Sequence, residues 1–195
     1  MARLDADVGT VATDASGTVF FATSTRIFRI VGGTGLVEHI AGSGIVGNGG
    51  DGGPALAAQL DAPHGLAAAG GALFFSDGGN DRVRRIDLVT GIITGVAPIV
   101  GPAGLALGAD GSLFVCEARA NRLLRIDPFG AVTVVAGTGT RRSTGDGGPA
   151  TAAAIDTPTD VAVAADGTLY VLEGFASGRI RRIDPAGRIG TLMRR

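Results

Sequence analysis

The fold of this chain is decided by residues 102–137, whose sequence is PAGLALGADGSLFVCEARANRLLRIDPFGAVTVVAG. This stretch contains four runs rich in β-branched or large apolar side chains, and Gly, Asp, Asn or Pro closes each run. The runs are Gly104–Leu107, Ser112–Cys116, Asn121–Ile126 and Ala131–Ala136. Four short strands joined by tight turns are typical of a four-stranded antiparallel meander.

The same pattern occurs four times along the chain. Its second run begins after Gly17, Gly71, Gly111 and Gly167, so successive copies are 54, 40 and 56 residues apart. Both long spacings contain an additional block, Gly-Asp-Gly-Gly-Pro-Ala, at residues 50–55 and 145–150. Without the segments that carry this block the period is about 40 residues, which is the length of a β-propeller blade.

Two parts of the repeat are shared with a known family: Asp-Gly-x-Leu-(Phe/Tyr)-Val, and Gly-x-(apolar)-Thr-x-(apolar)-Ala-Gly. With them the chain resembles the NHL repeat, and the Gly-Asp-Gly-Gly-Pro-Ala block is similar to one in many bacterial NHL-repeat proteins. The resemblance implies an all-β, NHL-type β-propeller of four blades, each a four-stranded antiparallel meander. It says little about the ligand, because one fold hosts many functions.

We expect a single propeller domain over residues 1–195, because no blade of a repeat array is stable alone. The blades are expected at residues 8–42, 63–100, 101–137 and 158–192, with insertions at residues 43–62 and 138–157. Each insertion is predicted to be a glycine loop followed by a short helix. In the first one Pro54 suits the first helical position, and Leu56 and Leu60 would share a helix face.

Composition excludes several classes of protein. Hydrophobic residues make up 45% of the chain, charged residues 18%, and there are 34 glycines, which suits a soluble protein of short strands and tight turns. A net charge of −1 favours neither nucleic acid nor an acidic membrane. Cys116 lies in an apolar run and is expected to be a small buried hydrophobe. No signal-peptide core or membrane-length run occurs, which favours the cytoplasm unless the chain is a piece of a secreted protein.

Strand direction predicts where a working surface would lie. In an up-and-down blade, the turn between the second and third strands and the link to the next blade emerge at the same end. That end would carry both insertions and the acidic turns, and loops on a rigid scaffold commonly carry binding. The candidate binding residues there are His64, Asp160, Asp77, Glu117, Glu173, Asp51 and Asp146.

These acidic residues have a structural interpretation as well. A carboxylate in a turn can accept backbone N–H groups or pair with a nearby Arg. Calcium needs six to eight oxygen ligands, whereas each insertion loop offers one carboxylate, so we expect no metal there. The arginines of the third strands could suggest RNA, which some NHL propellers bind. Aromatic residues, however, are 5% of the chain and Trp is absent, which leaves little for base stacking.

An enzymatic alternative comes from relatives by fold, since propeller lyases and lactonases coordinate a metal through residues of several blades. His64 and Asp160 would enter the innermost strands, but Ala103 and Gly104 offer no ligand in the third blade, and His39 is expected in an outer strand. Our hypothesis is therefore a non-catalytic interaction module without a cofactor, which binds a protein or other macromolecule on the insertion-bearing face. The alternative is a metal-dependent lyase or lactonase-like enzyme.

Four blades leave three arrangements open: a closed four-bladed ring, an open arc that pairs with a second chain, or part of a longer protein. An open arc would expose two apolar blade faces, which soluble proteins rarely leave bare. We therefore expect a protein partner, with self-association through open blade edges as one form of it. Nucleic acid and membrane are not expected as partners.

Overall fold

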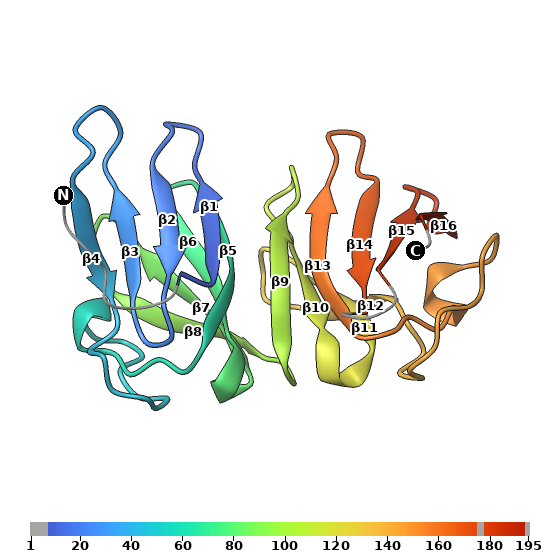
Figure 1. Cartoon of the computed structure of the whole chain (residues 1–195), viewed down its shortest axis with the longest axis horizontal. Helices are drawn as coiled ribbons and strands as arrows, with labels where there is room; N and C mark the ends of the chain where they lie inside the picture. Colours follow the sequence, from blue (N-terminus) through green and yellow to red (C-terminus); the bar gives the residue numbers. More distant parts are fainter. Residues whose placement is uncertain (1–7, 175–177, 194–195) are drawn as a thin grey trace. The chain divides into compact units, whose positions relative to one another are not determined.

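The computed structural model describes residues 8–174 and 178–193. The described chain is all-β, with four separate four-stranded sheets in which consecutive strands pair antiparallel (Figure 1). This confirms the four predicted meanders, which we call blades 1 to 4. The chain divides into two compact units, one ending at Pro98 and one beginning at Ile99, and each unit holds two blades.

The N-terminal unit contains blades 1 and 2. Blade 1 consists of β1 (Thr10–Thr13), β2 (Val19–Ala22), β3 (Ile27–Ile30) and β4 (Val37–Ala41). Blade 2 consists of β5 (Pro63–Ala69), β6 (Ala72–Asp77), β7 (Arg82–Asp87) and β8 (Ile93–Pro98). Two short 3-10 turns belong to this unit, η1 (Ala55–Ala57) in the first insertion and η2 (Gly78–Asn80) between β6 and β7.

The C-terminal unit repeats this plan in blades 3 and 4. Blade 3 consists of β9 (Pro102–Leu107), β10 (Leu113–Glu117), β11 (Arg122–Ile126) and β12 (Val132–Ala136). Blade 4 consists of β13 (Pro158–Val163), β14 (Leu169–Glu173), β15 (Arg179–Ile183) and β16 (Ile189–Met193). Its 3-10 turns are η3 (Ala118–Ala120) and η4 (Ala150–Ala152). No helix among the described residues has the length and apolar character needed to cross a membrane.

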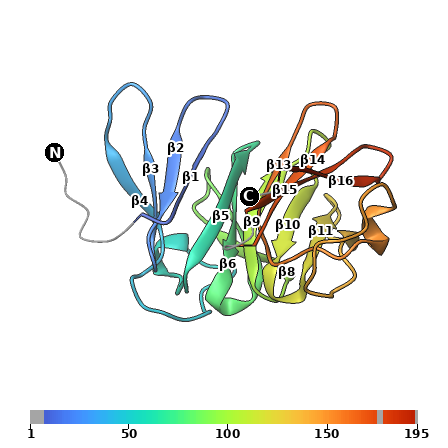
Figure 2. The same cartoon turned by 45° about the vertical axis from the view of Figure 1, so that its right-hand side comes forward.

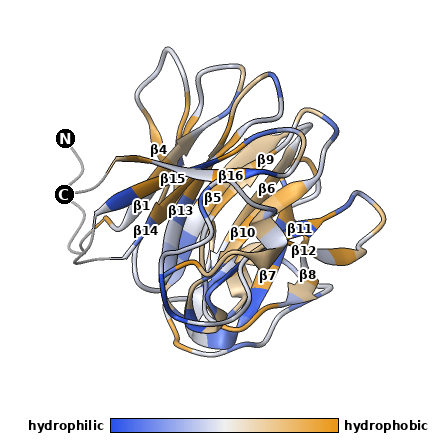
Figure 3. Ribbon diagram, turned by 90° about the vertical axis from the view of Figure 1, so that its right-hand side faces the viewer, coloured by the Kyte–Doolittle hydropathy of each residue, from blue (hydrophilic) through white to orange (hydrophobic). Residues whose placement is uncertain are grey.

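Each unit has its core between its two sheets. In the N-terminal unit Phe20 and Ile27 of blade 1 pack with Leu73 and Phe75 of blade 2, and all four are buried. Figure 3 shows how strongly apolar residues concentrate in the strands rather than in the connecting loops. The successive apolar residues of the strands are explained by this stacking of sheet on sheet.

The loops of the N-terminal unit separate as strand direction predicts. The β1–β2 and β3–β4 hairpin turns lie at one end of blade 1, and the first insertion lies at the other (Figures 1 and 2). The insertion reaches the β6–β7 turn of blade 2, where the Asn80 side chain donates to the Gly47 carbonyl at 2.7 Å. Within this unit, the insertion and an acidic turn therefore occupy the same end.

A six-residue helix does not form in either insertion, and only the predicted helical turn is present. The first insertion makes a single 3-10 turn at Ala55–Ala57, and Pro54 before it is extended. The carbonyl of Ala55 accepts the Gly42 N–H at 2.9 Å, and the carbonyl of Ala58 accepts the Ser43 N–H at 2.7 Å. These bonds to the end of blade 1 take up the carbonyls that a longer helix would need.

Because the helix is absent, Leu56 and Leu60 do not share a face: Leu56 is 52% exposed, whereas Leu60 is fully buried in the core. We predict that Leu60→Ala lowers the free energy of unfolding by about 2 to 5 kcal/mol, because it leaves a cavity. The matched control Leu56→Ala is expected to change it by less than about 1 kcal/mol. Urea unfolding followed by circular dichroism measures both, and equal effects would contradict the burial difference.

Candidate functional site

Both insertions are docked on the outer edge of the blade that follows them. In the first insertion the Gly52 N–H donates to the Ile93 carbonyl at 2.8 Å, and the Ile93 N–H donates to the Gly53 carbonyl at 3.0 Å. In the second, Gly147 and Gly148 make the same two bonds with Ile189, at 2.8 and 3.0 Å. Each block therefore adds a short antiparallel segment to the edge strand β8 or β16, which covers part of an exposed sheet edge.

A buried arginine fixes the first insertion to blade 2. The side chain of Arg84 in β7 is completely buried, and its Nε and Nη2 donate to Asp51 Oδ1 at 2.9 and 2.8 Å. Its Nη1 donates to Asp77 Oδ2 at 3.1 Å and to the Gln59 carbonyl at 2.8 Å, and Nη2 also reaches the Gly49 carbonyl at 3.1 Å. A buried guanidinium is tolerated only with such partners.

Blade 4 repeats this arrangement except at one atom, because Arg181 Nε is buried without a hydrogen-bond partner among the described residues, whereas Arg84 Nε donates to Asp51. Arg181 of β15 is fully buried, and its Nη2 donates to Asp146 Oδ1 at 2.8 Å and to the Thr144 carbonyl at 3.1 Å. Its Nη1 donates to Glu173 Oε1 at 2.9 Å and to Ser143 Oγ at 3.0 Å. We call each set of an arginine, a block aspartate and a strand-end acid an arginine clamp.

Glycine is required in the block because its backbone approaches the following 3-10 turn closely. Gly50 has φ +101°, and a Cβ there would lie 2.7 Å from the Ala58 Cα. Gly145 has φ +90°, and its Cβ would lie 2.8 Å from the Ala153 Cα. Any side chain at either position would have to displace main chain.

Blade 3 shows what replaces the clamp where no insertion precedes the blade. Leu124 occupies the place of Arg84, since the registers pair Phe75 with Arg84 and Val115 with Leu124. Glu117 then pairs with the half-exposed Arg122, whose Nε donates to its Oε2 at 2.8 Å. Among the described residues, fully buried arginines therefore occur only in the two blades that an insertion precedes.

The structure shows that most of the predicted binding residues are committed to the fold. Asp51 and Asp77 meet at one clamp and Asp146 and Glu173 at the other, while Glu117 pairs with Arg122. Asp77 also accepts the Asp61 N–H at 2.8 Å, as expected for a turn acid. His64, in β5, and Asp160, in β13, are the members of the predicted set that lie outside these ion pairs, and both are exposed, as are Asp51 and Asp146.

Sequence reasoning missed two exposed apolar side chains in the first insertion. Ile45 and Val46 are 60% and 62% exposed, although they lie in a loop held by the Arg84 clamp. In the second insertion Arg141 lies in the corresponding part of the loop and pairs with Asp156, with 3.0 Å between Nε and Oδ1. The signal in the sequence was the Ile-Val pair, which is unusual within a glycine-rich loop.

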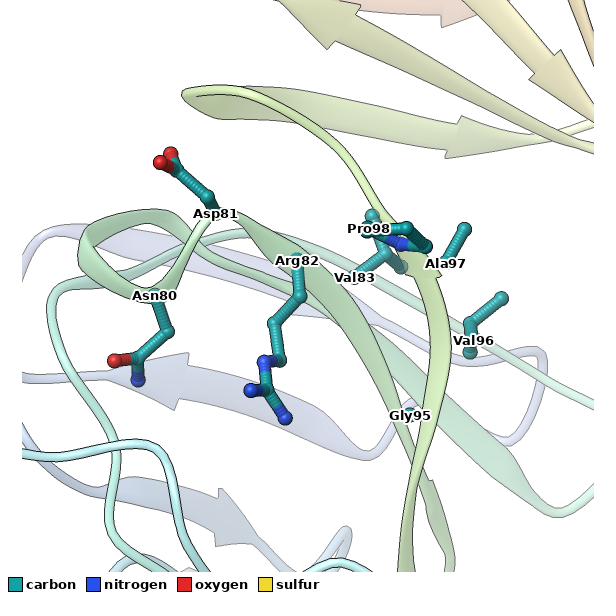
Figure 4. Close-up of a pocket in the computed structure, with 8 residues that line it drawn as sticks. All are labelled: Asn80, Asp81, Arg82, Val83, Gly95, Val96, Ala97 and Pro98. Carbon is teal, nitrogen blue, oxygen red and sulfur yellow. The ribbon is translucent and has the colours of Figure 1, made fainter.

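A groove lies beside the first insertion's anchor. Its volume is about 320 Å³, and it is lined by Asn80–Val83 and Gly95–Pro98, which are drawn in Figure 4. Arg82 lines it and is fixed by Asp51, since its Nη1 donates to Asp51 Oδ2 at 3.0 Å. The volume is at the lower end of the range for small-molecule sites.

The end of the C-terminal unit that carries the tight β9–β10 and β13–β14 turns is also grooved. In the C-terminal unit a groove of about 300 Å³ is lined by Asp110 and Asp166 together with Phe114 and Val163. The side chain of Arg125 donates to Asp110, as do both donors of Ser112, and these bonds lower the pKa of Asp110 to about 2. Asp110 is therefore ionised throughout the physiological range.

Metal-ligating side chains do not gather in the described part of the chain. Among residues 8–174 and 178–193 there is no group of three or more His, Cys, Asp or Glu side chains that could hold an ion. His39 lies in β4, an outer strand as expected, and its Nε2 lies 2.9 Å from the Ala41 carbonyl oxygen and 2.7 Å from that of Gly42.

Comparison with known proteins supports the fold. No family model matches the chain, and no curated protein matches it by sequence. An inactive variant of virginiamycin B lyase from Staphylococcus aureus, solved with quinupristin, is similar with a TM-score of 0.68 and 21% identity over 98% of this chain and 57% of the lyase. A chain in a nidogen/laminin complex gives a TM-score of 0.72 and 16% identity over 96% of this chain and 65% of that one.

A gluconolactonase from Xanthomonas campestris gives a TM-score of 0.55 at 20% identity, over 68% of this chain and 47% of the lactonase. The chain therefore spans about half to two thirds of the length of these solved structures. At these identities the likeness establishes a β-propeller type of fold and nothing about activity.

The clamp makes a prediction about stability. We expect Arg84→Leu to lower the free energy of unfolding by about 3 to 5 kcal/mol, because the buried Asp77 carboxylate loses its cation. The matched control Arg85→Leu removes a partly exposed pair with Asp87 and is expected to cost less than about 1 kcal/mol. Urea unfolding measures both variants. An equal loss of unfolding free energy in the two would show that the buried clamp stabilises the chain no more than an exposed ion pair does.

The acidic groove makes a prediction about pH. The pKa of Asp110 is lower in the folded than in the unfolded chain, so its contribution to stability is complete above about pH 4 and is lost as the pH falls toward 2. Arg125→Gln removes the largest cause and is expected to raise the pKa of Asp110 toward that of a free aspartate. NMR titration of the carboxyl carbons tests this, with Asp166 as the control because its pKa is lowered chiefly by Thr168. An unchanged Asp110 titration would contradict the assignment.

Proposed function

We propose that this chain is an NHL-repeat interaction module, a single propeller domain that binds a protein or another macromolecule on its insertion-bearing face. Catalysis and a cofactor have no part in the proposed mechanism. The observation that carries the proposal is the exposed pair Ile45 and Val46, displayed on a loop that the Arg84 clamp anchors. The family membership and the domain boundary at residues 1–195 belong to the same proposal.

The energetics favour such a contact. Fully burying an Ile or Val side chain contributes about 1.5 to 3 kcal/mol, so this pair alone could supply a useful part of a micromolar affinity. The clamp reduces the cost of ordering the loop, because its backbone is already bonded at Gly49 and Gly52. The nidogen/laminin complex shows that a propeller-like chain can be part of a protein complex, which supports a protein partner here.

The test uses a random peptide library displayed on phage and selected on the immobilised chain. We expect enriched peptides to lose at least tenfold in affinity for the double variant Ile45→Asp, Val46→Asp, because a charge replaces each apolar contact. The control Val89→Asp changes an even more exposed apolar residue in the β7–β8 turn and should leave affinity unchanged. Equal binding to the wild type and both variants would place the contact elsewhere.

A second candidate is a metal-dependent lyase or lactonase-like enzyme, which is favoured by the lyases and gluconolactonases among the similar structures. His64 and Asp160 are its candidate ligands, since both are exposed near the start of a first strand. Metal analysis of the purified chain after dialysis against Mn²⁺ separates the two candidates. The interaction module predicts no stoichiometric ion, whereas an ion bound one to one and lost in His64→Ala would contradict the module without a cofactor and favour the enzyme.

A further inference from the structure

In blades 2 and 4, the core contacts identify the residues that face the preceding blade. In the N-terminal unit, blade 2 contributes an apolar set to the core that it shares with blade 1, and every member is at most 7% exposed. In the C-terminal unit, blade 4 contributes the corresponding set to the core shared with blade 3. The sets are Leu66, Leu73, Phe75, Ile86 and Ile93 in blade 2, and Val161, Leu169, Val171, Ile183 and Ile189 in blade 4.

Blade 1 has apolar residues at the same five positions, on the face turned away from blade 2. The registers establish the equivalence, because Val11 pairs with Phe21 as Leu66 pairs with Phe75 and as Val161 pairs with Val171. The five residues are Val11, Val19, Phe21, Ile30 and Val37, and we call them the blade 1 face. Val11 is 64% exposed and Val37 is 40% exposed, whereas their counterparts are buried; Val19 and Ile30 are half-buried, and Phe21 is buried within the chain itself.

An aromatic row extends across this face. Phe21 stacks on Phe28 with 5.2 Å between ring centroids, and Phe28 contacts His39 at 5.2 Å. Phe28 stands where blades 2 and 4 have the clamp arginine, since Phe21 pairs with Phe28 as Phe75 pairs with Arg84. The face of blade 1 is therefore apolar even at the position where the other two blades bury a charge.

Each blade has a second face on the other side of its sheet. In blades 1 and 3 this second face packs against the next blade, whereas in blade 4 it is exposed. In blade 3 these positions hold Cys116, Leu123 and Ala136, all fully buried against blade 4. In blade 4 they hold Leu172, Ile180 and Met193, and with Tyr170 and Ala162 they form what we call the blade 4 face. Met193 is 53% exposed, and a groove of about 180 Å³ lies between Tyr170, Leu172 and Ile180.

We propose that the blade 1 face of one copy of this chain packs on the blade 4 face of a second copy, forming a blade-to-blade junction between molecules. The junctions inside the two units supply the template, because each pairs the same two kinds of face. A second copy is the occupant to which we commit, since both faces belong to one chain and since the similar lyase continues beyond the 57% of its length that this chain covers. Head-to-tail contacts of this kind form rings when they close.

The proposed junction between copies differs from the blade-to-blade junctions inside the units at the first strand of the blade. In the C-terminal unit, a Cβ on Gly104 would lie 2.6 Å from the Asp160 Cα, so the two inner strands pack closely because one carries glycine. Between copies the inner strand of blade 4 would present Asp160 itself, which prevents such a close approach. We therefore expect an association that depends on concentration rather than a permanent one.

The first measurement is the mass of the full chain by light scattering over a range of concentrations. We expect the mass to rise with concentration, and we expect Val11→Arg or Leu172→Arg to return it to that of the monomer. Both residues are exposed, so neither substitution disturbs a core. The matched control Phe129→Arg changes an exposed apolar residue in the β11–β12 turn and should leave the association intact. A wild type that stays monomeric at all concentrations would overturn the proposal.

Disulfide trapping tests the faces themselves. Chains carrying Val11→Cys are mixed with chains carrying Leu172→Cys under mild oxidation, and we expect cross-linked pairs of one of each. The native Cys116 does not interfere, because burial raises the pKa of its thiol and keeps it inert. Val11→Cys mixed with Phe129→Cys should not cross-link. If a chain carrying both Val11→Cys and Leu172→Cys closes on itself as a monomer, the two faces meet within one molecule and the intermolecular junction is wrong.

This inference is independent of the proposed function. Ile45 and Val46 lie in the first insertion and belong to neither face, so the peptide experiment and the association experiment can fail separately.

Discussion

The buried guanidinium groups of Arg84 and Arg181 constrain much of this structure. A charge that is removed from water must be surrounded by acceptors, and no single strand can supply them. Each arginine draws one carboxylate from the end of a neighbouring strand and one from an insertion that lies more than thirty residues earlier in the sequence. The path of both insertions, their pairing with β8 or β16, and the glycines at their turns all serve to bring that second carboxylate into place.

The clamp changes what the insertion-bearing end can do. Carboxylates that look available in the sequence, such as Asp51 and Glu173, are bound to arginine and offer little to a ligand. Outside the clamp, the exposed side chains at this end of the N-terminal unit include the apolar pair Ile45 and Val46 and also His64, beside a groove bounded by Arg82. The proposed recognition by shape and apolar contact rests on the exposed pair Ile45 and Val46.

The blades could be predicted from the sequence because their signal is local and repeated four times: short apolar runs, closed by turn residues, at a regular spacing. The acidic turn role of Asp77 could be predicted for the same reason. The insertion helix could not, because hydrogen bonds from Gly42 and Ser43, which come from another element, decide the conformation after Ala57. The clamps were also missed as units, since Arg84 and Asp51 meet only through tertiary structure. A comparison of the blades would have revealed the link between arginine and insertion. Blade 3 follows blade 2 without an insertion, and it has Leu124 where blades 2 and 4 have the arginine.

That substitution in blade 3 has a consequence for how such chains can change over time. An arginine at the position of Leu124 without an insertion would be a buried ion with one carboxylate too few, and an insertion without the arginine would have lost its anchor. Each intermediate is expected to be less stable than the chain that has both or neither, so the block and the arginine should be inherited, duplicated or deleted together. A propeller of this type can then vary its loop face one whole blade at a time while its sheets stay the same.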